Sequence, residues 1–170
     1  MLADGVVSQC RFGRLAVVDP SVGAGTDRVL GGRLSNYKRN VSALILYKAD
    51  GTMLLQHRTK EAPTFPDHWS LFGGGIEDDE TPEQAVRREI LEELGYQLAS
   101  PRLFTVQQIA DEKIHVFVER YNGRPLILQE GQAMGWFLPS ATKDLLMVDA
   151  ERTIIEALGE TLNPRASGSR

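Results

Sequence analysis

Three acidic side chains, those of Glu89, Glu92 and Glu93, stand at spacings that would bring them together on a helix. An α-helix turns about 100° per residue, so the three would share an arc of about 100°. Like charges three or four residues apart destabilise a helix by a few tenths of a kcal/mol each when nothing neutralises them. Carboxylate oxygens are, however, the protein ligands that Mg²⁺ takes alongside water and phosphate oxygens. The cluster therefore indicates a divalent-cation site.

Local signals predict the helix that would carry these residues. Thr81 is a favoured N-cap, Pro82 suits the first helical position, and Gln84 completes a capping box with Thr81. Gly95 is a natural C-terminal stop. We therefore expect a helix from about Pro82 to Leu94. Its apolar stripe would consist of Val86, Ile90 and Leu94, flanked by Leu91.

Strand patterns surround this helix and would position it on a sheet. Apolar, β-rich runs separated by turn signals such as Asp50-Gly51 and Asn122-Gly123 predict these strands. The predicted ranges are 41–48, 53–58, 69–72, 103–109 and 114–120, with 125–129 and 135–138 as further candidates. The first two strands should pair, and helical spacing predicts a final helix over 150–162. Together these elements predict a mixed α/β (α+β) fold.

Composition favours one domain with short extensions. The 170 residues, 42% of them hydrophobic and 25% charged, suffice to bury a core without disulfides or structural metals. We expect the domain at residues 38–162, after an N-terminal extension of loop or short hairpin at 1–37 and before a flexible tail at 163–170. No apolar run approaches the roughly 20 residues of a membrane span, so no membrane partner is expected.

Net charge and cysteine content limit the binding partners and the cellular compartment that we expect. A net charge of −4 disfavours a nucleic-acid polymer as partner, and an anionic substrate would need a cation as mediator. Residues 1–10 lack the basic and apolar regions of a secretory signal. Cys10 is the only cysteine, which excludes an internal disulfide. We therefore expect a reducing, cytoplasmic setting.

The residues around the acidic cluster resemble a known motif. Gly74 is followed after five residues by Glu80, and after seven more by REILEELGY, residues 88–96. This frame is similar to the box of the Nudix hydrolases at each of its fixed Gly, Glu and Arg positions. The stretches VSALILYKADGTMLLQHR, HWSLFGGGIE and EGQAMGWF extend the resemblance over about residues 38–162. Tyr96, where the family usually has an aliphatic residue, should affect packing and not chemistry.

The resemblance implies a fold, a reaction and a cofactor. The fold would be an α/β/α sandwich with a mixed sheet. The reaction would be hydrolysis of a phosphoanhydride bond in a nucleoside diphosphate linked to a group X, with Mg²⁺, or Mn²⁺ in its place, as cofactor. The partner would be a small nucleotide or nucleotide-like diphosphate, and a homodimer is compatible with the resemblance. Specificity would lie in loops such as 59–67, 111–113 and 121–124.

The resemblance also assigns roles to single residues. The metal ligands would be the carbonyl of Gly74 and the carboxylates of Glu89, Glu92, Glu93 and Glu130. The catalytic residues would be Arg88, Glu89 and Glu92. Arg88 would pair with Glu92 one turn on, and Glu89 is one candidate for the base among several carboxylates. Glu80 would support the loop or accept waters of the metal, and Arg58 would contact substrate phosphates.

Alternative interpretations stay open at this point. A non-catalytic nucleotide-sensing module on the same fold would have no need of all three acids in the cluster. Isomerisation of an isoprenoid diphosphate is disfavoured because Cys10 lies far upstream of the predicted domain. Without the motif, the cluster would be a solvated helix face and Glu130 a loop carboxylate. The three histidines have no metal-binding spacing.

Overall fold

The computed structural model describes residues 39–109 and 111–163. The predicted extension at 1–37 lies outside the described residues, as does nearly all of the predicted tail at 163–170. The strands are β1 (Arg39–Tyr47), β2 (Met53–His57), β3 (Trp69–Ser70), β4 (Phe72–Gly75), β5 (Arg102–Ile109), β6 (Glu112–Arg120) and β7 (Ala133–Phe137). The helices are α1 (Pro82–Leu94), the 3₁₀ helix η1 (Pro139–Asp144) and α2 (Asp149–Leu162).

The strands form one mixed sheet. Its order is β3-β2-β1-β6-β5, with β4 also paired to β1 and β7 to β2. β1 and β6 run parallel from the pair Arg39 and Glu112 to the pair Tyr47 and Arg120, whereas the remaining pairs of strands are antiparallel. The predicted pairing of the first two strands is confirmed: β1 meets β2 at Met53, from which β2 continues along β7.

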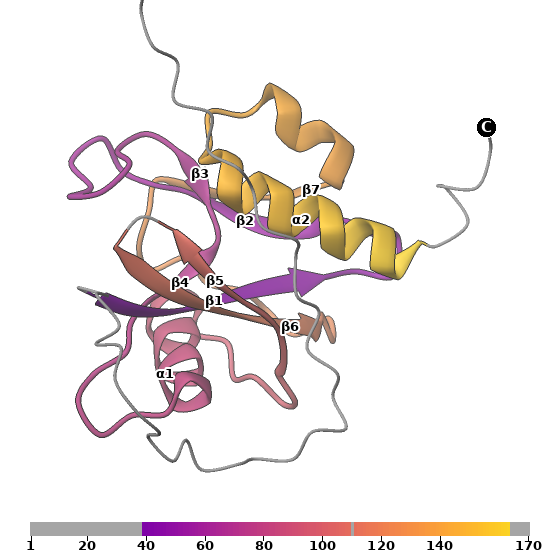
Figure 1. The fold of residues 1–170 in the computed structure, drawn as a ribbon. Coiled ribbons are helices and arrows are strands. Elements are labelled where there is room, and N and C mark those ends of the chain that lie inside the picture. Colours follow the sequence, from indigo (N-terminus) through magenta and orange to yellow (C-terminus); the bar gives the residue numbers. More distant parts are fainter. Residues whose placement is uncertain (1–38, 110, 164–170) are drawn as a thin grey trace, which may run out of the picture.

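The two α-helices cover opposite faces of the sheet (Figure 1). The core under α1 includes Leu44, Phe72, Val86, Ile90 and Leu94. The core under α2 includes Ala43, Ile45, Val116, Ile154, Ile155 and Leu158. Successive residues of β1 therefore face opposite cores, as the two-residue period of a strand requires. The predicted α/β/α sandwich is confirmed, and no helix in the described ranges is long and apolar enough to cross a membrane.

α1 begins and ends where the local signals predict. The Thr81 hydroxyl accepts the backbone N–H of Gln84 at 3.2 Å, and the Gln84 side chain accepts that of Thr81 at 2.8 Å. Gly95 adopts a left-handed conformation with φ of 58°, and its N–H donates to Leu91 O at 2.9 Å. Tyr96 is buried in the core under α1, in line with a packing role.

Two segments differ from the predicted strands. The predicted strand 69–72 is interrupted at Leu71, and the glycines expected after it belong to β4. Gly73 has a φ of 137°, and a Cβ there would lie 2.2 Å from Ser42 O, so only glycine lets β4 approach β1 this closely. Residues 125–129 form no strand, because the N–H groups of Ile127 and Gln129 bond the last carbonyl groups of α1. Tertiary contacts to a helix end thus replace a strand ladder.

Candidate active site

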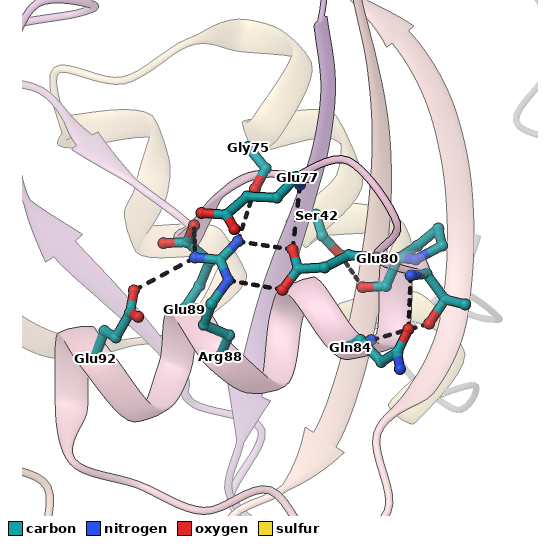
Figure 2. Close-up of polar contacts among 10 residues, drawn as sticks. Ser42, Gly75, Glu77, Glu80, Gln84, Arg88, Glu89 and Glu92 are labelled. Carbon is teal, nitrogen blue, oxygen red and sulfur yellow. Dashed lines mark hydrogen bonds and ion pairs between the residues drawn. The ribbon is translucent and has the colours of Figure 1, made fainter.

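Arg88 lies at the centre of a polar cluster on α1 (Figure 2). Its Nε and Nη2 donate to the two oxygens of Glu80 at 2.8 and 2.9 Å, a bidentate pair across the loop that precedes the helix. Its Nη1 donates to Glu89 at 2.8 Å and reaches Glu92 at 3.4 Å, and Nη2 also donates to Gly75 O at 3.0 Å. The hydrogen bonds from Arg88 lower the pKa of Glu80. Arg88 therefore holds the loop, the end of β4 and Glu89 in one arrangement.

Glu89 lies directly against the glycines of β4. A Cβ built on Gly74 would stand 2.5 Å from the Glu89 carboxyl group, so the missing side chain at Gly74 creates the space that this carboxylate fills. Arg88 holds the carboxylate through Oε1. Sequence reasoning assigned both residues to one site, and the structure brings them together.

Glu93 is the buried member of the cluster, with only 6% of its surface exposed. Its Oε2 accepts the backbone N–H of Gly73 at 2.9 Å, and its Oε1 is 3.4 Å from Gln56 Nε2. Burial raises the pKa of Glu93 to about 8; the Gly73 hydrogen bond opposes this, while the charges of Glu89 and Glu130 add to it. Two further carboxylates, those of Glu89 and Glu130, thus interact electrostatically with Glu93.

The helical arc shared by Glu89, Glu92 and Glu93 spans the boundary between core and solvent. The Glu92 side chain is 58% exposed, and its one polar contact among the described residues is the long one to Arg88. The predicted pair of Arg88 with Glu92 is therefore present, but the shorter bonds of Arg88 go to Glu80 and Glu89. Sequence spacing placed three acids on one arc, and the packing of α1 gives each a different environment.

Glu130 and Arg58 face Glu93 across an open cavity of about 440 Å³. Glu130 lies on the exposed segment between β6 and β7, and its charge contributes to the raised pKa of Glu93. The Arg58 side chain donates to Thr64 O at 2.9 Å and to Thr64 Oγ1 at 3.3 Å, within its own loop. The structure therefore brings the two residues to the side of the cluster that Glu93 occupies.

A network of hydrogen bonds holds the segments that carry Glu130 and Arg58. The Gln132 side chain donates to Arg58 O at 2.7 Å and to Asp67 Oδ1 at 2.8 Å. The Gln132 N–H donates to His57 O at 2.8 Å, and His57 Nε2 lies 3.1 Å from Asp67 Oδ1. One amide side chain thus ties the loop after β2 to the residues just beyond Glu130.

Sequence reasoning did not single out Glu151, a partly buried acid in the first turn of α2. Its Oε2 accepts the backbone N–H of Leu71 at 3.3 Å. Burial raises its pKa to about 7, against the lowering effects of that hydrogen bond and of the positive charge of Arg58. The signal was present in the sequence, because Glu151 precedes Ile154, Ile155 and Leu158 at three, four and seven residues and so falls on the apolar stripe of the helix.

The donors around Glu93 have the chemistry that a hard divalent cation requires. Glu89 and Glu93 offer carboxylate oxygens beside the backbone of Gly73 and Gly74, and a cation there would relieve the repulsion among the acids. Across residues 39–109 and 111–163, no three acidic, histidine or cysteine side chains stand close enough to form a complete metal cluster unaided. The substrate and water would supply the remaining ligands, as they commonly do for Mg²⁺.

Known proteins share the motif and the fold. Nucleoside triphosphatase NudI from Escherichia coli (strain SE11) is 49% identical over 53 residues, which cover 31% of this chain and 38% of that protein. The chain thus matches well under half the length of these curated relatives. The crystal structure of a MutT NUDIX hydrolase from Burkholderia pseudomallei superposes with a TM-score of 0.59 and 29% identity, covering 69% of this chain and 95% of that one.

A second solved structure resembles this chain in its fold. The NUDIX domain of Shewanella oneidensis NrtR, solved in complex with ADP ribose, superposes with a TM-score of 0.62 at 18% identity, covering 74% of this chain and 88% of that one. The model of the NUDIX domain family matches residues 36–158, well over half of the sequence. With its box on α1 and its α/β/α sandwich, this chain belongs to the NUDIX family.

Proposed function

We propose that this protein hydrolyses a phosphoanhydride bond in a nucleoside diphosphate linked to a group X, with a divalent metal ion as cofactor. One observation carries the proposal: the carboxylates of Glu89 and Glu93 lie against Gly74 and Gly73, and the same two glycines line a cavity of about 450 Å³. Negative charge that could bind a metal ion therefore lies next to a cavity that could hold an organic group, and both are at β4. The nucleoside triphosphatase and hydrolase names of the relatives support a reaction of this class.

The residues that would hold the metal are Glu89, Glu93 and the carbonyl of Gly74, with Glu130 completing the site when substrate arrives. Glu92 stays a candidate ligand at the solvent edge of the cluster. A divalent cation, Mg²⁺ or Mn²⁺, would neutralise phosphate charge and lower the pKa of an attacking water. Glu130 lies on an exposed segment, and such segments often complete a site only in the bound state.

The remaining residues would orient the reacting groups. Arg88 fixes the Glu89 carboxylate, and Glu80 fixes Arg88 through two hydrogen bonds. Glu89 would then take the proton of the attacking water as general base. Arg58 would leave Thr64 to bind a substrate phosphate, for which a guanidinium offers a bidentate fork. Phosphoryl transfer asks a protein mainly for such positioning and charge stabilisation.

The test is a hydrolysis screen with purified protein over deoxynucleoside triphosphates, dinucleoside polyphosphates, nucleotide sugars and dinucleotide cofactors. We expect release of a phosphorylated product that requires added Mg²⁺ or Mn²⁺ and stops with EDTA. Inactivity over the whole panel with either metal would contradict the proposal. Tight nucleotide binding without any turnover would favour the alternative, a nucleotide-sensing module.

A further inference from the structure

The segment that carries Glu130 lies close against the end of β2. Gly131 has a φ of 91°, and a Cβ there would stand 3.1 Å from His57 O and 3.5 Å from Gln56 Oε1. Gln56 is buried, and its Nε2 lies 3.4 Å from Glu93 Oε1. Glycine therefore lets the backbone next to Glu130 approach the strand residue that contacts Glu93.

Gln132 fastens the same segment to the loop of residues 58–68, which joins β2 to β3. Its side-chain Nε2 donates to Arg58 O at 2.7 Å, where the loop begins, and to Asp67 Oδ1 at 2.8 Å, near its end. A side-chain amide nitrogen carries two hydrogens, so these two acceptors use both of them. One side chain therefore joins both ends of the loop to the segment of Glu130.

The base of this loop is also closed by its own backbone. The Arg58 N–H donates to His68 O at 2.9 Å, and the Asp67 N–H donates to Thr59 O at 3.1 Å. The Arg58 side chain starts from this closed base and lines the open cavity of about 440 Å³ that Glu130 also lines. The position of the base relative to Gln132 therefore sets where Arg58 stands relative to Glu130.

We propose that Gln132 is the positioning residue that holds Arg58 and Glu130 in place for a metal-bound diphosphate, an assignment that rests on the proposed function. In that function Arg58 binds a substrate phosphate and Glu130 completes the metal site, so both must act on one ligand. Each belongs to a different connecting segment. Holding both segments together before the ligand arrives lowers the conformational entropy that binding costs.

A purely structural role for Gln132 predicts different behaviour. If Gln132 only stabilised the fold, its loss would weaken every ligand of the site alike. In the described ranges its side chain donates to the loop and not to Glu89 or Glu93, the acids of α1. Loss of Gln132 should therefore weaken a ligand that needs Arg58 and Glu130, and should spare a metal ion held by α1 alone.

The test variants change donors and keep side-chain size. Q132E replaces the amide by a carboxylate, which only accepts hydrogen bonds and would face two acceptors, Arg58 O and the Asp67 carboxylate. D67N supplies a donor opposite the new carboxylate, and asparagine tolerates the φ of 59° at this position. Q97E makes the same chemical change at an exposed glutamine outside the site and is the matched control.

The first experiment measures binding and needs no turnover. Calorimetry gives the Kd of Mn²⁺ alone and of the preformed complex of Mn²⁺ with methylenediphosphonate, a diphosphate that cannot be hydrolysed. We expect Q132E to weaken binding of the complex by about 10-fold or more and that of Mn²⁺ alone by less than about 2-fold. Q132E/D67N should recover part of the loss, and Q97E should match the wild type.

Three results of this experiment would overturn the proposal. They are wild-type affinity of Q132E for the complex, equal weakening of both ligands, and no binding of the complex by the wild type. The thermal midpoint of Q132E shows whether that variant is folded.

The second experiment uses the wild type and so does not depend on the folding of a variant. Hydrogen exchange measured by mass spectrometry follows residues 58–68 and 130–132 with and without the complex of Mn²⁺ and methylenediphosphonate. Because Gln132 joins the two segments, binding of the complex should slow exchange in both. Protection of one segment without the other would contradict the positioning role.

The two proposals fail in different ways. If no substrate is hydrolysed but Q132E weakens binding of the complex and spares Mn²⁺ alone, hydrolysis is rejected and the positioning role stands. If substrates are hydrolysed with metal but Q132E binds the complex as tightly as the wild type does, hydrolysis stands and the positioning role is rejected.

Discussion

Two glutamates from opposite faces of the sheet reach the same short stretch of backbone. Glu93 of α1 accepts the N–H of Gly73, and Glu151 of α2 accepts that of Leu71, two residues earlier. Burial raises the pKa of both, to about 8 for Glu93 and about 7 for Glu151. In their backbone anchor and in the direction of their pKa shift the two acids are therefore alike, although Glu93 is buried and Glu151 only partly so.

The neighbours of these two glutamates differ. Glu93 has the carboxylates of Glu89 and Glu130 near it, whereas Glu151 has the positive charge of Arg58. The charges therefore act on the two pKa values in opposite directions: the neighbouring acids raise the pKa of Glu93, and Arg58 lowers that of Glu151. The comparison teaches that a shared backbone anchor leaves the charge around a carboxylate to be set by the elements packed against it.

The largest expected effect is on catalysis, and it comes from replacing Glu93, the acid of α1. E93Q should lower kcat by about 10² or more for every nucleotide, because stabilisation of developing phosphoryl charge depends on the metal that Glu93 would hold. Steady-state kinetics with saturating Mg²⁺ measures this effect. E83Q, an exposed residue of the first turn of α1 paired with Arg87, is the control and should keep wild-type kcat. A rate near that of wild type in E93Q would reject the site.

A smaller effect is expected from Glu130, the acid on the exposed segment. E130Q should lower kcat by about 10 to 10³ but less than E93Q, because its carboxylate joins the site only with substrate bound. With substrate present, E130Q should need a higher Mg²⁺ concentration for half-maximal activity than the wild type does. A structure with metal and substrate analogue in which Glu130 still points to solvent would reject this role and leave the acids of α1 as the carboxylate ligands.

The smallest expected effect concerns stability and Glu151. Its folded-state pKa of about 7 lies above the ordinary 4.5, so its contribution to stability is full below pH 4.5 and is lost as pH rises through 7. The unfolding free energy of the wild type minus that of E151Q should therefore fall between pH 4.5 and 8, by about 1 to 3 kcal/mol. Denaturant unfolding at several pH values measures this difference. A flat difference would mean that Glu151 titrates as an exposed acid.

The sequence determined the parts of the site that depend on neighbours along the chain. The limits of α1 follow from Thr81, Gln84 and Gly95, each of which acts within one turn of its partner. The i,i+4 contact of Arg88 with Glu92 and the shared arc of the three glutamates follow from helical geometry. Local rules of hydrogen bonding and of helix period were sufficient there, because no distant segment is needed to satisfy them.

The tertiary structure decided which of these side chains meet distant partners. Glu93 is buried because β4 lies beside α1 and offers the Gly73 N–H, and Gly74 makes room for Glu89 only because that strand crosses under the helix. Residues 125–129, with strand-like composition, bond the end of α1 instead of a neighbouring strand. Glu151 is a single acid on an apolar stripe in the sequence, and only the packing of α2 against Leu71 gives it a cavity to face. Each outcome depends on segments tens of residues apart, whose meeting is set by the packing of the whole sheet and not by local propensity.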